Sequence, residues 1–377
     1  MTLLEWIEGL AQNVLPHLLK YRCAPAGHNG PYFDRETPVR NTGHWLVTFN
    51  RLHALTGIDR YREAAVVCAE YLLSQEARPG GFAFHHRDAR DKDHCNGLVG
   101  QAWTFEALAE AAALTGDSRF TAVAEEVFLL HDFDTVTGLW FRLEVDGTRL
   151  SIDRAFNHQL WFAAGGALID SADVRQRCER FLDRLEDNIV VCPNGLIWQQ
   201  VDATAARHAE ASRMPLTQAL IERLRLRIEG DAARSFRKDS RLYRKSVGYH
   251  TFNTYALAVL KTVFRDHGTW SGKTMDAVTG YLRSEEFSDD IGEESAYGFP
   301  YNAPGFEFSY SALELAGLDL AATVTATQHW VDRQRQRTWD ADLNCFVPAV
   351  PDPVTLTARC YELMRLPDEV FSITLAS

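Results

Sequence analysis

Apolar residues recur at intervals of three and four along several stretches of the chain, and each stretch ends at a short polar turn. In residues 96–114 the apolar positions are Leu98, Ala102, Phe105, Leu108, Ala109 and Ala112. This spacing places them on one face of a helix. Gly116 can end that helix in the left-handed conformation, and Asp117 or Ser118 can cap the next one. The pattern predicts half of a helical hairpin.

The same pattern recurs along the chain. Residues 41–65 repeat it about fifty residues earlier, with a His and an Asn near the start and a Leu-Thr-Gly turn between two helices. Weaker copies begin near residues 156, 249 and 306. A period of this size indicates a repeated supersecondary unit whose neighbours bury each other's faces.

The repeat predicts the fold class, which is all-α. First helices are expected at 42–56, 96–114, 157–170, 249–263, 308–318 and 354–365, and second helices at 59–74, 118–131, 174–188, 272–284 and 322–336. The last first helix lacks a partner, and so does an amphipathic helix at 2–20. Pairing these two closes an (α/α)6 toroid of helical hairpins, whereas the alternative is an open solenoid. Gly-aromatic segments at 81–84, 138–141 and 195–198 predict short β-hairpins whose rings would rim the mouth.

One stretch does not fit the period. We expect a single domain over residues 1–377 with an insertion at about 201–245, which could also hide a seventh hairpin. Residues 207–245 hold eleven Lys or Arg and five Asp or Glu, although the chain has a net charge of −12. This basic stretch favours an anionic sugar as partner; the alternative is an ordinary solvated surface helix.

Composition excludes several classes of function. The net charge of −12 argues against a nucleic-acid partner, and no apolar run reaches the roughly 18 residues of a membrane span. The first residues show helical periodicity and lack the pattern of a secretory signal. The seven cysteines are odd in number and form no CxxC pair, so we expect reduced thiols and a cytoplasmic protein.

Polar residues gather in the links that lead into the first helices. In a toroid these links emerge at one end, where helix N-termini favour polar and anionic groups. Seven of the thirteen histidines fall there, beside several carboxylates, and such residues can serve as general acids and bases. The candidate catalytic residues are Asp34, Asp93, His94, His158, His250 and Glu307. The candidate substrate-binding residues are Arg40, Asn41, His44, Asn96, Trp140, Arg142, Trp198, Tyr249, Tyr301 and Asn302. For Asp93 the alternative is a helix cap.

We expect no metal and no cofactor. His85, His86, His94, Cys95 and His250 show none of the spacings of a zinc site. Nucleophile-elbow, Walker A, G-x-G-x-x-G and calcium-loop motifs are also absent from the sequence, which leaves acid–base chemistry.

The hairpin count, the LTGD turns, the Gly-aromatic segments and the NGLVGQAW stretch resemble the six-hairpin glycosidase superfamily, in particular a branch found among polysaccharide gene-cluster proteins. The resemblance implies a sugar substrate bound in the funnel of the toroid. It also extends to the N-acylglucosamine 2-epimerase group, which has the same ring and uses histidines for proton abstraction.

Three hypotheses about function follow. The leading one is a glycoside hydrolase of polysaccharide metabolism that uses acid–base residues at inner-helix N-termini. The first alternative is a sugar epimerase or isomerase of the N-acylglucosamine 2-epimerase type. The second is a non-catalytic protein that binds glycans or assists their assembly.

Overall fold

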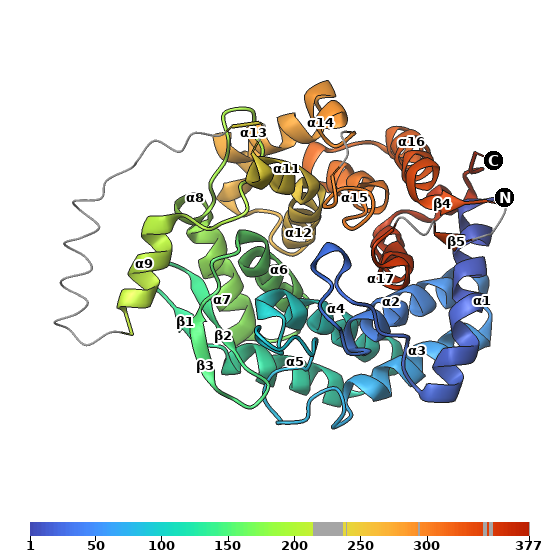
Figure 1. The fold of residues 1–377 in the computed structure, drawn as a ribbon, viewed down its shortest axis with the longest axis horizontal. Helices are drawn as coiled ribbons and strands as arrows, with labels where there is room; N and C mark the ends of the chain where they lie inside the picture. The colour runs from blue at the N-terminus through green and yellow to red at the C-terminus, as the bar shows by residue number, and fades with distance from the viewer. Residues whose placement is uncertain (214–236, 239, 293–294, 342–344, 347–349, 377) are drawn as a thin grey trace.

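The computed structural model describes residues 1–377 except for 214–236, 239, 293–294, 342–344, 347–349 and 377. Within the described residues six helical elements form an inner ring, and each packs against the next until the last meets the first (Figure 1). These elements are α2 (Val39–Thr56), α4 (Gly97–Thr115), α6 (Phe156–Ala167), α12 (His250–Val263), α15 (Pro304–Ala316) and the continuous segment of α17 (Pro353–Ala358) and η3 (Arg359–Arg365). The predicted (α/α)6 toroid is confirmed.

A second layer of helices covers the outside of this ring (Figure 1). It consists of α1 (Leu3–Tyr21), α3 (Asp59–Leu72), α5 (Ser118–Leu130), α7 (Ala172–Asp183), α13 (Lys273–Leu282) and α16 (Leu320–Thr338). Shorter helices in the links are α8 (Leu185–Asn188), α9 (Ala203–Ala211), α11 (Arg241–Gly248), α14 (Glu285–Asp290), η1 (Gly30–Tyr32), η2 (Gly268–Ser271) and η4 (Asp368–Ser372). The inner helices are the more apolar layer, because both of their sides face other helices.

The polar turns end the helices as their sequences predict. Gly57 and Gly116 adopt φ angles of 69° and 70°, and each donates its N–H to a carbonyl of the helix that it ends. The side chain of Asp117 then caps α5 by accepting from Arg119 N. A residue with a side chain would be strained at the two glycine positions, so these turns separate inner from outer helices.

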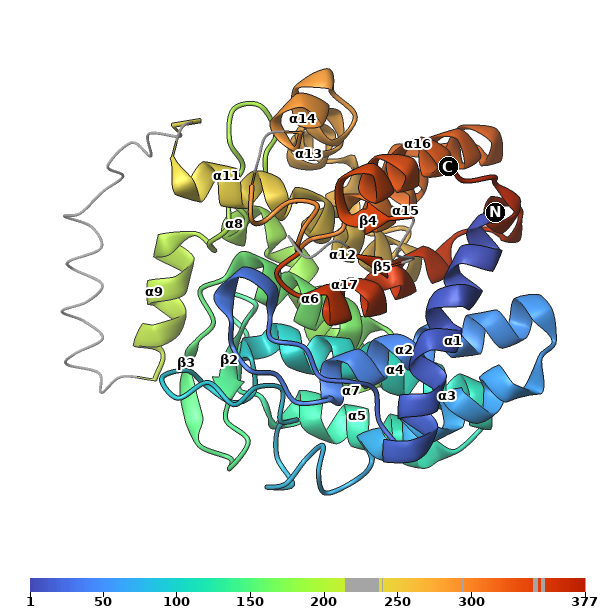
Figure 2. The ribbon, with the colours of Figure 1, turned by 45° about the vertical axis from the view of Figure 1, so that its right-hand side comes forward.

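The ring closes where the two chain ends meet. Leu3 N donates to Ile373 O at 2.9 Å, and Leu375 N donates to Met1 O at 3.0 Å. Helix α1 packs against α2, α3 and η4, and its Trp6 ring lies 6.0 Å from Phe306 in the inner ring. Figures 1 and 2 both show the termini side by side. Helix α1 therefore closes the ring as predicted. In the C-terminal part of the chain it packs mainly against η4, and not against the expected helix at 354–365.

The Gly-aromatic segments differ from expectation. Strand β2 (Leu139–Leu143) pairs with β1 (Phe133–Asp134) and β3 (Arg149–Ile152) in an antiparallel sheet, and β4 (Trp339–Asp340) pairs with β5 (Cys345–Phe346). Residues 81–84 form no strand, and residues 195–198 contribute one isolated bridge. The prediction that their rings rim the mouth is wrong for Phe84 and Trp140. Both are fully buried, because their side chains turn inward to fill the core between the helical layers.

Glutamine side chains attach these segments to the inner helices. Gln101 of α4 accepts from Phe84 N at 2.7 Å and donates to the carbonyls of Phe84 and Cys95. Gln159 of α6 repeats this arrangement on Trp140 and Asp153. Each buried amide thus fixes the link that leads into its own helix, and with it the side chains that the link presents.

The expected insertion is only partly described. Helices α9 and α11 lie in it, whereas residues 214–236, on which a seventh hairpin would depend, lie outside the described ranges. The single-domain boundaries and the insertion remain predictions.

Candidate active site

A cavity of about 330 Å³ opens at the predicted end of the toroid. Five of the six inner elements, all but α15, contribute residues to its wall. Helix α11 and the links before α2, α4, α6, α9 and α15 supply the rest. Its size suits a small sugar, since ligand pockets commonly start at about 300 Å³. Seven of the predicted site residues line it, namely Asp34, Arg40, Asn96, His158, Tyr249, Tyr301 and Asn302.

The other nine predicted residues do not line this cavity. They are Asn41, His44, Asp93, His94, Trp140, Arg142, Trp198, His250 and Glu307. Asp93, His94 and Arg142 instead line a shallower depression beside it. Trp140 packs among Phe128, Phe162 and Phe181 in the core, so it presents no face for a sugar.

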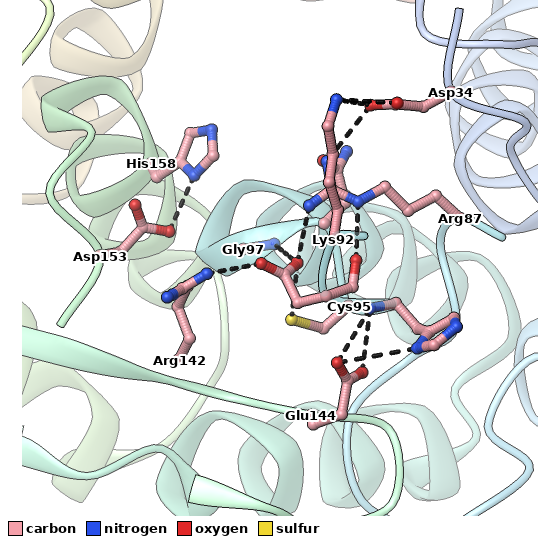
Figure 3. A network of polar contacts seen from close by, with 12 residues as sticks. Asp34, Arg87, Lys92, Cys95, Gly97, Arg142, Glu144, Asp153 and His158 are labelled. Carbon is pink, nitrogen blue, oxygen red and sulfur yellow. Dashed lines mark hydrogen bonds and ion pairs between the residues drawn. The ribbon is translucent and has the colours of Figure 1, made fainter. Parts of the chain in front are cut away.

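Asp93 and Glu307, the expected catalytic carboxylates, are engaged elsewhere. Asp93 accepts from Gly97 N at 2.7 Å, as in the helix-cap alternative, and forms ion pairs with Arg87 and Arg142 (Figure 3). Burial opposes its ionisation, but these contacts outweigh burial and lower the pKa of Asp93 to about 2. Glu307 is fully buried and binds Thr251 and Arg359.

His158, which lines the cavity, forms a pair with the buried carboxylate of Asp153. Asp153 directly follows β3 in the short link before α6, and His158 is the third residue of that helix. The His158 Nδ1 lies 2.8 Å from the Asp153 Oδ2, and Figure 3 shows the second ring nitrogen pointing away from the carboxylate. Within the described part of the chain that nitrogen, Nε2, has no hydrogen-bond partner.

Asp153 is held in its ionised form. Its carboxylate accepts from Leu98 N and Ala155 N, each at 3.1 Å, in addition to His158. Burial raises the pKa of Asp153, but His158 and the two N–H groups lower it further, so the net pKa lies below its usual value. An ionised Asp153 can only accept a hydrogen bond, so in the neutral imidazole Nδ1 carries the proton and Nε2 keeps a lone pair. His158 is therefore prepared to act as a base.

Asp34 is the single carboxylate among the described residues that line the cavity. Its two oxygens lie 2.8 and 2.7 Å from Lys92 Nζ, and Arg87 approaches to 3.5 Å (Figure 3). Asn29 also donates to it at 3.4 Å. Both oxygens of Asp34 are thus already engaged by donors from the protein.

The rear wall carries two arginines backed by buried carboxylates. Arg40 donates to Glu36 at 3.1 Å and stacks at 3.9 Å over the Trp103 ring. Arg359 donates to Asn302 Oδ1 and to both Glu307 and Glu362. Both guanidinium groups are almost fully buried, so they are fixed hydrogen-bond donors at the cavity wall.

Three tyrosines, Tyr32, Tyr249 and Tyr301, also line the cavity. The hydroxyls of Tyr32 and Tyr249 lie 3.0 Å apart, and Tyr301 donates to Asn29 at 2.9 Å. Burial raises the pKa of Tyr32 and Tyr249 well above that of a free tyrosine, so both stay protonated and can donate. The ammonium of Lys245 lies over the rings of Tyr32 and Tyr249.

Sequence reasoning missed four of these residues as site candidates, namely Tyr32, Arg87, Lys92 and Arg359, whereas Lys245 belongs to the basic stretch that was expected to bind an anionic sugar. Tyr32 lies two residues before Asp34 in the same link, so the polar link itself was the available signal. Arg359 was hidden inside the last expected helix, which breaks into η3 at this residue. Among the described residues no group of three or more His, Cys, Asp or Glu side chains could hold a metal ion. No helix in the described ranges is long and apolar enough to span a bilayer.

His250, a predicted catalytic residue, does not line the cavity and instead holds a link in place. It lies behind the cavity against Tyr281 and Phe287, and its Nδ1 accepts from Ile197 N at 3.4 Å. Ile197 belongs to the third Gly-aromatic segment, so His250 anchors that link as Gln101 and Gln159 anchor theirs. Burial lowers the pKa of His250 to about 3, so the folded protein holds it neutral.

Replacing His250 with glutamine tests this position through the pH dependence of stability. Below a pH of about 6.5 the unfolded chain binds a proton that the folded chain excludes, so the free energy of unfolding falls by about 1.4 kcal/mol per pH unit for this histidine. His250→Gln removes that contribution while keeping a hydrogen-bond acceptor. Urea melts at several pH values should show a shallower loss of stability between about pH 6.5 and 4 than in the parent. An equal slope in the two proteins would contradict the assignment.

No family model matches the chain. Over 355 residues it is 42% identical to archaeal glycosylation protein Q of Haloferax volcanii, an alignment that covers 91% of this chain and 92% of that protein.

Two solved structures share its fold at low sequence identity. Cellobiose 2-epimerase from Bacillus thermoamylovorans B4167 superposes with a TM-score of 0.62 at 10% identity, over 96% of this chain and 98% of the other. An inactive variant of the α-1,6-mannanase GH76A from Salegentibacter sp. HEL1_6, with two aspartates replaced and α-1,6-mannotetrose bound, gives 0.58 at 12% identity, over 98% and 100%. The chain therefore shares the (α/α)6 toroid fold of this epimerase and this mannanase, and its sequence shows that it belongs to the family of archaeal glycosylation protein Q.

Proposed function

We propose that the chain is a sugar epimerase or isomerase, in which His158 removes a proton from a carbon next to a carbonyl group. One observation carries the proposal. The cavity contains a histidine whose Nδ1 is held by the buried Asp153 and whose Nε2 is left without a partner among the described residues. A neutral imidazole oriented in this way is the usual general base near neutral pH.

Glycoside hydrolysis, the leading hypothesis from the sequence, receives less support. It generally needs two carboxyl groups that flank the bond to be cleaved. In the described part of the cavity wall the one carboxylate is Asp34, and Lys92 and Arg87 already occupy it. Asp93 and Glu307 lie outside the cavity in ion pairs of their own. Among the described residues the site therefore has a histidine base but no free pair of carboxyl groups.

The remaining wall residues fit the charge changes of proton abstraction. When His158 Nε2 takes the proton, the electron pair of the C–H bond moves to the carbonyl oxygen and forms an enediolate. Arg40 and Arg359 are fixed donors that could stabilise this oxygen. The hydroxyls of Tyr32 and Tyr249 could return a proton from the other face, which inverts the carbon. Delivery of a solvent-exchanged proton from His158 to the neighbouring carbon would instead give isomerisation.

The comparisons are consistent with either outcome. A cellobiose 2-epimerase and a D-mannose isomerase are among the structures that share the fold, and the homologous archaeal protein is named for glycosylation. On this basis we propose that the reaction prepares sugars for glycan assembly.

The proposal can be tested by incubating the purified protein with reducing sugars and short oligosaccharides in D₂O. Epimerisation or isomerisation should place solvent deuterium on the carbon next to the carbonyl and change the sugar's configuration, both visible by NMR. Chain shortening without deuterium on that carbon would instead support the hydrolase. Binding without either change would support the non-catalytic alternative, and each of these two results would overturn the proposal.

A further inference from the structure

The cavity wall is strongly cationic in an acidic protein. Its charged residues are Arg40, Arg87, Lys92, Arg154, Lys245 and Arg359, against the single described carboxylate of Asp34. The chain as a whole has a net charge of −12. A concave site lined by one sign of charge concentrates ligands of the opposite sign.

Most of these cations already have a carboxylate partner. Arg40 pairs with Glu36, Arg87 with Asp93, Lys92 with Asp34, Arg154 with Glu210, and Arg359 with Glu307 and Glu362. Lys245 differs from all of them. Among the described residues no carboxylate lies within ion-pair distance of its ammonium group.

Tyrosine rings hold this ammonium in place at the cavity. Its Nζ lies 5.3, 5.4 and 5.6 Å from the ring centres of Tyr32, Tyr249 and Tyr297. Tyrosine faces attract a cation but leave its N–H donors unused. Burial and the positive charges of Arg241 and Lys92 all lower the pKa of Lys245, as expected for an ammonium group that has no carboxylate partner among the described residues.

We propose that Lys245 is the specificity residue that binds an anionic group of the sugar substrate, either a carboxylate or a phosphate. A bound anion would supply the missing partner, and its hydrogen bonds to an ammonium in a partly buried site are of the strong, charge-assisted kind. The inference rests on the proposed function in taking a sugar as the ligand. It does not depend on which reaction follows.

Few described residues of the basic stretch 207–245 reach the cavity. The basic stretch 207–245 suggested an anionic partner, but its described residues mostly face elsewhere. Lys238 is exposed and pairs with Glu286, and Arg241 donates to the Tyr297 hydroxyl at 3.0 Å. Of the described residues in the stretch, Leu242 and Lys245 line the cavity. Among the described residues of the stretch, Lys245 is therefore the one cation positioned to bind an anionic sugar in the cavity.

Calorimetric titration of the full chain tests the inference without requiring turnover. The probes are D-glucuronate, D-glucose 6-phosphate and neutral D-glucose. At least one anionic sugar should bind about 10- to 100-fold more tightly than glucose, the range expected for one charge-assisted contact. A preference for glucuronate identifies the anion as a carboxylate, and a preference for the phosphate identifies it as a phosphate ester.

Two variants make the test specific. Lys245→Met should lower affinity for the preferred anionic sugar about 10-fold or more and leave affinity for glucose unchanged. Lys238→Met, from the same stretch, should change neither. Equal affinity of the parent for neutral and anionic sugars, an unaffected Lys245→Met protein, or no binding of either anion at about 10 mM would each overturn the inference. Failure of deuterium exchange with the anion preference intact would overturn the proposed reaction alone.

Discussion

Replacing His158 with glutamine should lower the turnover rate by about two to four orders of magnitude, the usual contribution of a positioned proton-transfer group. The effect should fall on kcat more than on KM, because the sugar is held mainly by the arginines and tyrosines of the wall. Thermal melting should change little, since His158 is partly exposed and its ring makes one hydrogen bond among the described residues. Steady-state kinetics and circular dichroism check the two expectations.

His94→Gln provides the matched control. Its side chain is 48% exposed and lies outside the cavity, although the sequence placed it in the same class as His158. Its replacement should leave kcat within about twofold, because it supplies no proton-transfer step. If the two glutamine variants retained the same activity, His158 would not be the base and the proposed mechanism would fail.

Removing residues 1–20 should abolish the cooperative fold. Eight apolar side chains of α1 are buried, from Leu3 to Leu18. Burial of one large apolar side chain contributes about 2 kcal/mol, and a whole domain is stable by only about 5–15 kcal/mol. The truncated protein should therefore show no sigmoidal urea transition, and it should bind a dye that reports exposed apolar surface.

A point variant keeps this prediction testable if the truncated chain cannot be purified. Trp6 lies 6.0 Å from Phe306 and 5.3 Å from Trp339, so Trp6→Ala should cost about 3–5 kcal/mol of unfolding free energy. Asn13→Ala, on the exposed side of the same helix, should cost less than about 0.5 kcal/mol. Similar melting of the two variants would show that α1 does not close the ring.

The helices could be predicted from the sequence because their causes are local. Apolar periodicity and the Leu-Thr-Gly turns depend on residues within about ten positions, so the predicted spans agree with α1 through α5 to within a few residues. At α15 the expected start was too late, because Pro304 begins the helix four residues earlier. Proline is favoured at this first position, a signal that the periodicity alone did not include.

The candidate site was harder to predict, because it depends on which way each link turns. His158 and His250 both stand at the start of an inner helix, yet one enters the cavity and the other faces the outer helices. Trp140 was expected to bind sugar because it closely follows a glycine. Gln159, however, hydrogen-bonds both backbone groups of Trp140, and the ring packs in the core. Such choices follow from packing between segments far apart in the chain. Periodicity carries no information about them.

The seam between the chain ends has a consequence for the order of folding. Each hairpin joins residues within about fifty positions, whereas the hydrogen bond from Leu3 to Ile373 closes nearly the whole chain. Because each doubling of a loop adds about 0.6 kcal/mol of closure entropy, this contact costs about 2 kcal/mol more to form than a hairpin contact. Neighbouring hairpins should therefore assemble first into an open arc. The arc then becomes a ring in one late step, and the seam is the place where we expect that ring to reopen first.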